Sequence, residues 1–351
     1  MPRLPAAPAA PTRSPVPEVR HGRRVVAIVV LIPALVALAL WSFAWPAART
    51  APHHLPLGVA GPPAAAAQAE QGLTRHEGAF EIHRYADEAA ARDAIEHRTV
   101  YGAVVVTARG PELLTASAAG PVVAQALQQA VTRQAASEGS PVRVRTVDVV
   151  AAPPTDPRGS ALAASVLPMA MVGIGAGAAV TLLGLRGRRA VTALVGASAL
   201  VGVVAAAIAD SWLGVVTGDW WVETGALGLS TLAVGAAVAG VAALAGQRGV
   251  ALVSLVVMLL GNPFSGAASA PQMLPEPVGT IGQWLPPGAG ASLLRSVAFF
   301  DGAAASGPAL TLAWWAVIGL GLVLLGSTLP RRRPADTPRP ADAERAPALA
   351  G

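Results

Sequence analysis

The chain has 351 residues, of which 53% are hydrophobic and only 13% are charged. Soluble domains carry about twice this charged fraction, so the composition indicates an integral membrane protein. The net charge is +5, and all the cationic side chains are arginines, which border apolar stretches instead of forming a basic stripe with aromatic residues. We therefore expect the lipid bilayer, and not nucleic acid, as the partner of this basic chain. The sequence has no cysteine, which excludes disulfides and thiolate metal sites.

The arginines cluster in every second gap between six apolar stretches. These clusters are Arg20, Arg23 and Arg24 before the first stretch, Arg186, Arg188 and Arg189 after the second, Arg248 after the fourth, and Arg331, Arg332 and Arg333 after the sixth. The shorter connections in the other gaps are acidic, with Arg295 as their only base. Because cytoplasmic loops are rich in arginine, the pattern places both termini in the cytoplasm. The predicted fold class is an α-helical integral membrane protein with six transmembrane helices, N-in/C-in, and a small extracytoplasmic α/β domain between helices 1 and 2.

The chain begins with a Pro- and Ala-rich region, residues 1–24, which is typical of a disordered cytoplasmic tail. Residues 25–48 form the first predicted transmembrane helix, since Val25–Trp45 is apolar for long enough to cross the hydrocarbon core. A cleaved signal peptide is the alternative, with Ala44–Ala48 near the cleavage site. The apolar run is long for a signal peptide, which favours an uncleaved anchor.

Residues 49–158 have interspersed charges and short apolar runs, which predicts a soluble extracytoplasmic domain. Strands are predicted at Leu55–Gly61, Phe80–Tyr85, Val100–Thr107, Glu112–Ala118 and Val142–Val150, and helices at Ala64–His76, Glu88–Arg98 and Val122–Ala136. Strands that alternate with helices indicate an α/β sandwich.

Residues 159–330 are predicted to form a five-helix transmembrane domain, followed by a disordered cytoplasmic tail at 331–351. The further spans are Ala161–Leu185, Val191–Ala209, Gly225–Gly246, one that begins at Val250, and Ala309–Leu329. Gly173 and Gly177 form a GxxxG motif, and Gly319, Gly321 and Gly326 recur on the last helix. Small residues at such spacing let helix backbones approach closely and therefore predict a tight bundle.

The fifth span is interrupted by Gly261, Asn262 and Pro263, and residues 261–307 are rich in Gly and Pro with few charges. Backbone that leaves a helix at membrane depth must be satisfied by protein or by a water-lined cavity. We therefore predict a re-entrant outer segment at 261–307, of the kind that marks transport pathways. An ordinary outer loop that rests on the membrane is the alternative.

Several chemistries leave no trace in the sequence. We find no ionisable residue deep inside the six spans, which argues against an ion-driven pump. There is no phosphate-binding G-x-x-x-x-G-K-[ST] loop and no catalytic motif, so we expect neither an enzyme nor a bound cofactor or metal. Active transport would then need power from another subunit.

Three stretches resemble the permeases of type-2 ABC exporters, in particular the actinobacterial branch related to phage-infection (Pip-like) membrane proteins. They are DEAAARDAIEHRTVYGAVVV at 87–106 with LTASAAG at 114–120, DPRGSALAASVLPMAMVGIGAG at 156–177, and QWLPPGAGASLLRSVAFFDG at 283–302. The succession of one span, a large outer domain and five spans with a broken connection is also similar, over nearly the whole chain beyond the N-terminal tail.

The resemblance implies a homo- or heterodimeric permease subunit that exports a hydrophobic or amphipathic substrate and is powered by a separate ATPase. The candidate ATPase-docking residues are Arg23, Arg24, Arg186, Arg188 and Arg189, although topology alone also explains these arginines. The candidate substrate-exit residues are Asn262, Pro263, Pro286, Pro287, Arg295 and Asp301, with a pair between Arg295 and Asp301 as the structural alternative.

A second function stays open at this point. The predicted cytoplasmic loops are very short, which favours a non-transporting membrane protein whose outer α/β domain binds a ligand or an envelope partner. The wealth of Ala, Gly, Pro and Arg indicates a GC-rich bacterial gene, and the expected location is therefore the bacterial plasma membrane.

Overall fold

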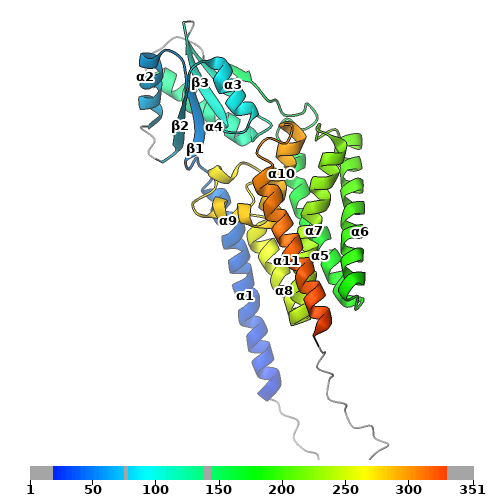
Figure 1. Cartoon of the computed structure of the whole chain (residues 1–351). Coiled ribbons are helices and arrows are strands. Elements are labelled where there is room, and N and C mark those ends of the chain that lie inside the picture. The colour runs from blue at the N-terminus through cyan, green and yellow to red at the C-terminus, as the bar shows by residue number, and fades with distance from the viewer. Residues whose placement is uncertain (1–18, 75–77, 109, 138–143, 330–351) are drawn as a thin grey trace, which may run out of the picture.

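The computed structural model describes residues 19–74, 78–108, 110–137 and 144–329. Figure 1 shows an α/β unit at one end of a bundle of long helices. We call this the domain-bearing end of the bundle and the other the opposite end. Residues 1–18 of the predicted N-terminal tail lie outside the described residues. So does the whole of the predicted C-terminal tail, residues 331–351.

The α/β unit contains a five-stranded sheet in the order β2-β1-β3-β4-β5. The strands are β1 (Leu55–Ala60), β2 (Phe80–Tyr85), β3 (Gly102–Thr107), β4 (Gly110–Thr115) and β5 (Arg145–Asp148), and the helices are α2 (Pro63–Thr74), α3 (Glu88–Glu96) and α4 (Pro121–Ser137). Strand β1 runs parallel to both β2 and β3, β4 is antiparallel to β3, and β5 is parallel to β4. The strands and helices follow one another in the predicted order. Strand β2 has its predicted bounds, β1 and β3 are shorter than predicted, β4 begins and ends earlier, and β5 ends two residues earlier.

Apolar side chains fill both faces of this sheet. On one face Leu57 and Leu113 pack with α2 and α4, and on the other Ile95 of α3 packs with Val105 and Leu114. Each of these two cores also receives residues from the distant segment 261–307, which brings Met273 to the first and Phe300 to the second. The α/β unit is thus joined to the bundle by shared hydrophobic cores, not only by its two linkers.

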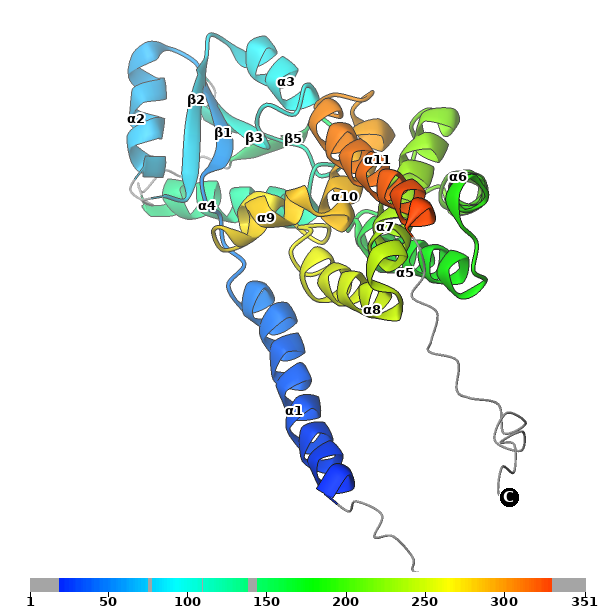
Figure 2. The ribbon, with the colours of Figure 1, turned by 60° about the horizontal axis from the view of Figure 1, so that its bottom comes forward.

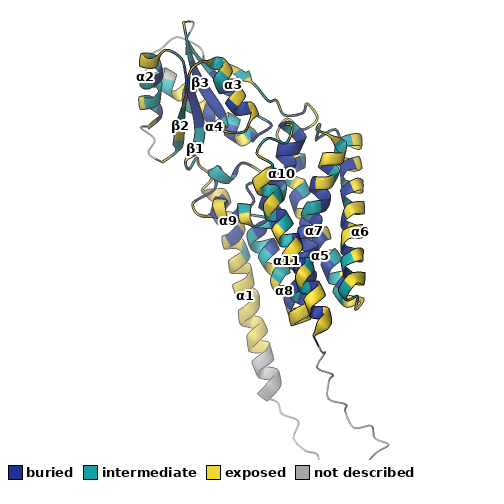
Figure 3. Ribbon diagram, viewed as in Figure 1, coloured by how far each residue is buried: buried dark blue, intermediate teal, exposed yellow. Residues whose placement is uncertain are grey.

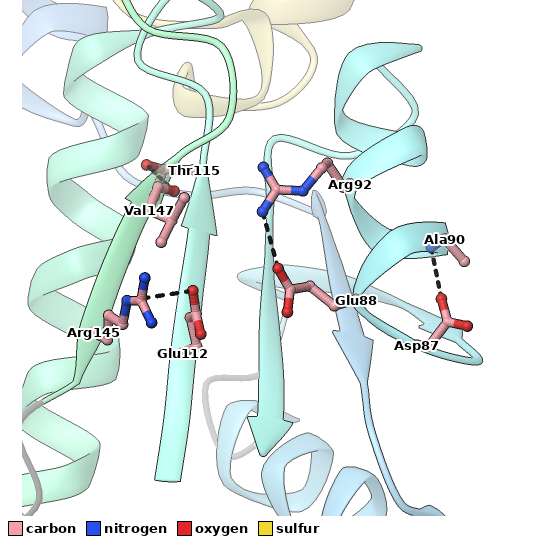
Figure 4. Close-up of polar contacts among 8 residues, drawn as sticks. All are labelled: Asp87, Glu88, Ala90, Arg92, Glu112, Thr115, Arg145 and Val147. Carbon is pink, nitrogen blue, oxygen red and sulfur yellow. Dashed lines mark hydrogen bonds and ion pairs between the residues drawn. The ribbon is translucent and has the colours of Figure 1, made fainter. Parts of the chain in front are cut away.

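Polar contacts hold the edges of the α/β unit (Figure 4). Asp87 caps α3 by accepting a hydrogen bond from the Ala90 amide at 2.8 Å, as the sequence predicts. Arg92 pairs with Glu88 one helical turn away at 2.9 Å. Because such pairs are exposed, each contributes only about 0.3–0.5 kcal/mol.

The described part of the chain contains five helices that are long and apolar enough to cross a membrane. These are α1 (Val19–Ala48), α5 (Ser160–Leu182), α6 (Gly187–Ala206) with its π-helical extension η1 (Ala207–Trp212), α7 (Trp220–Ala245) and α11 (Ser306–Thr328). Helix α7 lies in the middle, in contact with α5, α6, α10 and α11. The predicted close helix packing is confirmed at Gly173 and Gly177, where α5 approaches α7, and at Gly319, where α11 does.

The fifth predicted span is shorter than the other five. Helix α8 (Gln247–Val256) continues into the π-helical turn η2 (Val257–Gly261), and together they are about 22 Å long at 1.5 Å per residue. A hydrocarbon core is about 30 Å thick, so this helix is too short to cross it upright. The chain then forms a 3₁₀ turn, η3 (Pro271–Met273), and the helices α9 (Val278–Trp284) and α10 (Pro286–Phe299).

Helices α1 and α10 are opposites in burial (Figure 3). Helix α10 is buried almost throughout, with Leu293 and Val297 in one core with residues of α5, α7 and α11. An ordinary outer loop that rests on the membrane, the alternative for 261–307, would not be buried among other helices as α10 is. Helix α1 is exposed along nearly all of its described side chains and diverges from the bundle, touching it only near Ser42 and Trp45 (Figure 2).

Candidate functional site

The break after α8 and the start of α10 lie together inside the bundle. A Cβ atom built on Gly261 would come within 2.7 Å of Pro287 Cγ, so the proline ring fits against this glycine. Asn262 and Pro263 follow directly, and the Asn262 carbonyl accepts a hydrogen bond from Ser265 Oγ at 2.7 Å. The structure therefore brings four predicted exit residues together, since Pro286 and Pro287 form the first turn of α10.

A small cavity of about 30 Å³ lies beside these prolines. Its lining comes from α5, α7 and α10, and includes Ser165, Met169 and Ser230 as well as Pro286 and Pro287. The first amide groups of a helix have no intrahelical partner, and proline has no amide hydrogen. Two prolines at the start of α10 therefore leave fewer unpaired N–H groups where this helix begins within protein. This is how an irregular segment can end and restart inside an apolar bundle.

Arg295 binds the loop that follows the break. Its Nη2 donates to the Ala267 carbonyl at 2.9 Å, and the residue is only 4% exposed. Asp301 lies apart, in an exposed turn with φ of 48°, and the structure gives no ion pair between the two described side chains. The alternative that Arg295 pairs with Asp301 is therefore wrong, because the helix ends at Phe299 and the turn directs the aspartate to solvent.

The basic residues at the opposite end divide into two kinds. Arg186 donates from Nη2 to the Gly326 carbonyl at 2.7 Å and to the Leu329 carbonyl at 3.4 Å, and so binds the end of α11. Arg188 and Arg189, in the first turn of α6, are exposed. Arg23 and Arg24 fall within α1, but their side chains lie outside the described part of the chain. Of the predicted docking residues whose side chains are described, Arg188 and Arg189 are thus the two that remain free for a partner.

Replacing Arg186 by Ala should therefore loosen the end of α11. Hydrogen bonds from a charged donor contribute about 1.5–3 kcal/mol, and solvent exposure places this one at or below the lower end of that range. The melting temperature of the purified protein should fall in Arg186→Ala and stay unchanged in Arg188→Ala, since Arg188 makes no such contact through its side chain. Equal melting temperatures for the two variants would contradict this role of Arg186.

Two carboxyl groups lie inside the described spanning helices: Asp210 in η1, which is partly exposed, and Glu223 in α7. Glu223 has no exposed surface and falls in the first turn of α7, where its Oε1 accepts from the Gly218 amide at 2.8 Å. The sequence places Glu223 in the preceding connection, but Asp219 caps α7 by accepting from Trp221 and Val222, so the helix begins earlier than predicted. The residue serves this end of the helix and does not form a relay across the bundle.

The sequence analysis missed polar residues between the α/β unit and the bundle. Arg98, Tyr101, Gln272, Gln283 and Ser292 line a cavity of about 400 Å³ there. The one signal that could have found them is Arg98 itself, which follows the last turn of α3 with φ of 58°. This position favours glycine or asparagine, and an arginine at it therefore indicates a use for the side chain. Among described His, Asp and Glu side chains no cluster suits a metal ion.

These features define the class of the molecule: a multi-pass membrane protein with a broken helix built into its bundle. The family model of the ABC-2 family transporter proteins matches residues 23–327. The chain belongs to this family, and it is the membrane component of an ABC transporter, in agreement with the resemblance to type-2 ABC permeases. Neither the curated proteins nor the solved structures provide a match.

Proposed function

We propose that this chain is the permease subunit of an ABC exporter and moves a hydrophobic or amphipathic substrate with power from a separate ATPase. The observation that carries the proposal is the broken helix: α8 stops at Gly261, and α10 fills the space beyond it within the bundle. A path that starts in the bilayer and ends beside α10 suits a substrate with a large apolar part. We also propose the phage-infection-related branch of the family for it.

The charge distribution supports an orientation with both termini in the cytoplasm of a bacterial plasma membrane. Arg186, Arg188, Arg189 and Arg248 belong to the opposite end, whereas acidic residues gather near the α/β unit. Arginine-rich ends face the cytoplasm. In this orientation the α/β unit is extracytoplasmic, and 261–307 is a re-entrant outer segment.

Arg188 and Arg189 are the docking residues that we propose for the ATPase. They extend from the first turn of α6 at the proposed cytoplasmic face, and both are exposed. Arg23 and Arg24 would join them from the start of α1. Arg186 is set aside from this role because its side chain binds the end of α11.

A homo- or heterodimer is the proposed assembly. Helix α1 is apolar on all of its described faces, and only 6% of its most hydrophobic stretch of 18 residues is buried by the rest of the chain. Lipid can cover such a helix, but a second subunit that packs in the gap between α1 and the bundle would cover it as well (Figure 2). Crosslinking through a cysteine placed at an α1 position would report such a neighbour without interference, since the chain has no cysteine of its own.

The test is purification of the tagged full chain from its native membrane in mild detergent, with mass spectrometry of the proteins that co-elute. A stoichiometric ATPase should accompany the wild-type chain and be lost in the double variant Arg188→Glu/Arg189→Glu. Arg158→Glu is the matched control, because Arg158 is equally exposed but lies at the domain-bearing end. Recovery of the chain without an ATPase, while a known ABC exporter keeps its own in the same preparation, would contradict the proposal.

A non-transporting role is the second candidate. The observation that favours it is the small size of the opposite end, where a single residue, Gly246, separates α7 from α8. An ATPase would find little surface there. If the purification recovers envelope proteins in place of an ATPase, the function lies in binding by the α/β unit.

A further inference from the structure

A cavity of about 400 Å³ separates the α/β unit from α9, α10 and α11. Arg98 and Tyr101 line it from the α/β unit, Gln283 and Ser292 from α9 and α10, and Thr311 from α11. This volume lies within the range of about 300–1,000 Å³ that is typical of ligand sites. Every one of these polar groups except Arg98 is uncharged, so the guanidinium sets the charge of the cavity.

The backbone of Arg98 is held in a conformation that arginine disfavours. Its φ of 58° is left-handed, which costs a non-glycine residue about 1–2 kcal/mol. Its Nη1 donates to the Ser292 carbonyl at 3.1 Å and also to Ser296 Oγ, and its guanidinium lies 5.2 Å from the centre of the Phe300 ring. These contacts hold the guanidinium at the cavity, where a glycine would leave the backbone relaxed but provide no charge.

A second guanidinium lies close behind the first. Arg295 is buried, and it is near enough to Arg98 for the two positive charges to repel one another. Among the described side chains, no carboxylate lies within 4.0 Å of either arginine. Asp156 shares a small cavity with Arg295, but its oxygens accept from the amides at the start of α5. A buried and a partly buried positive charge therefore lie near one another without a counterion, which is costly unless a ligand supplies one.

The other titratable group in the cavity does not provide the missing negative charge. Burial raises the pKa of the Tyr101 phenol above its ordinary value, so this side chain stays protonated at neutral pH. Its hydroxyl group donates to Gln272 Oε1 at 2.8 Å. Burial also lowers the pKa of Arg98, but arginine starts from so high a value that it remains charged.

The rim of the cavity suits an apolar chain. Trp284, which lines the cavity, is 71% exposed, and Trp314 on α11 is 62% exposed. The Trp315 indole donates to the Trp284 carbonyl at 2.8 Å, which joins the end of α9 to the side of α11. Exposed tryptophans are enriched where the headgroups of a bilayer meet its hydrocarbon.

We infer that this cavity binds the anionic headgroup of an amphipathic molecule, such as a phosphate or carboxylate, with the hydrocarbon chain of that molecule lying outside against Trp284 and α11. Arg98 supplies the charged donor, Arg295 reinforces its field, and Gln283, Ser292 and Thr311 offer neutral hydrogen bonds. The inference rests on the proposed function in one respect. If the chain is an exporter, the bound amphipathic molecule belongs to the class of substrates that it exports. Binding itself requires neither an ATPase nor transport.

The experiment is a binding measurement on the purified, delipidated full chain in detergent, by native mass spectrometry. The probes are phosphatidylglycerol, phosphatidylcholine of equal chain length, and inorganic phosphate. We expect phosphatidylglycerol to bind more tightly than phosphatidylcholine, and inorganic phosphate to leave the phosphatidylglycerol adduct in place. In Arg98→Gly the affinity for phosphatidylglycerol should fall about tenfold or more, as expected when a charged hydrogen bond is lost. Arg295→Gln removes the second positive charge behind the cavity and should also lower this affinity, by less than Arg98→Gly does.

Arg92→Gln is the matched control, because Arg92 lies on α3, the helix that directly precedes Arg98, but pairs with Glu88. It should bind phosphatidylglycerol as the wild type does. Arg98→Gly should fold, since glycine accepts the left-handed backbone, and its melting temperature checks this. If that variant unfolds, Arg295→Gln decides.

Three results would overturn the inference. Equal binding of the two lipids, or wild-type affinity in folded Arg98→Gly and Arg295→Gln, would show that the arginines recognise no headgroup. Displacement of phosphatidylglycerol by inorganic phosphate at similar concentration would assign the cavity to a free anion. The co-purification of an ATPase is measured separately, so the failure of this inference is distinguishable from the failure of the proposed function.

Discussion

Replacing Gly319 by Ala should destabilise the helical bundle by about 1–3 kcal/mol, the usual cost of an extra carbon atom in a packed interior. A Cβ atom at Gly319 would meet the Ala236 carbonyl oxygen at 2.5 Å, and one at Gly240 would meet the Gly319 carbonyl oxygen at the same distance. Helices α7 and α11 therefore touch through their backbones, which cannot move aside as a side chain can. The melting temperature of the purified protein in detergent measures the effect.

Gly321 provides the matched control on the same helix. A Cβ atom there would have no neighbour within 4 Å, so Gly321→Ala should leave stability unchanged or raise it by up to about 1 kcal/mol through better helix propensity. Gly173 and Gly175 repeat the comparison on α5, where a Cβ would meet Val234 at 2.7 Å at the first and nothing at the second. If Gly319→Ala and Gly321→Ala melt alike, α7 and α11 do not pack as closely as described.

Local sequence patterns were sufficient for much of the fold. Phe80–Tyr85 begins and ends as a strand where its alternation predicts, and Asp87 caps α3 as a short acceptor before a helix should. The long apolar stretches likewise form helices within a few residues of their predicted ends. In each case the element forms because of interactions within its own segment, or because its apolar face packs against some apolar neighbour. The element can therefore be predicted without knowing which neighbour that is.

Local sequence patterns do not predict the contacts between residues that lie far apart in the chain. Arg98 follows a short helix with acidic residues, yet its side chain donates to the carbonyl of Ser292, nearly two hundred residues away. Nothing within 87–100 indicates this, because the partner is a carbonyl oxygen and every residue has one. The burial of Arg295 was missed for the same reason: an arginine in a Gly- and Pro-rich connection gives no sign that the connection is packed inside the bundle. The sequence therefore located the break and the two prolines that pack beside it, but not the burial of Arg295 or its separation from Asp301.

The second large effect should come from Asp156, at the junction of the α/β unit and the bundle. Its carboxylate accepts from the amides of Ser160 and Ala161 at 2.9 Å each and from Leu162 at 3.4 Å, and it is 5% exposed. Asp156→Ala would leave these donors at the start of α5 without a partner in a buried place. We expect the free energy of unfolding to fall by about 2–3 kcal/mol, because a charged acceptor at a buried helix start contributes more to stability than an ordinary N-cap does.

Two variants separate this role from a general effect of lost charge. Asp156→Asn keeps one carbonyl oxygen as an acceptor and should recover part of the loss, whereas Asp219→Ala, at the exposed cap of α7, should cost only about 1 kcal/mol. Trypsin provides a local measurement, since Arg158 lies exposed between Asp156 and α5. Cleavage after Arg158 should accelerate in Asp156→Ala and not in Asp219→Ala. If cleavage does not accelerate in Asp156→Ala, the shared cores at Met273 and Phe300 hold the α/β unit and α5 together without the cap. The coupling between the two parts of the molecule must then pass through the segment 261–307.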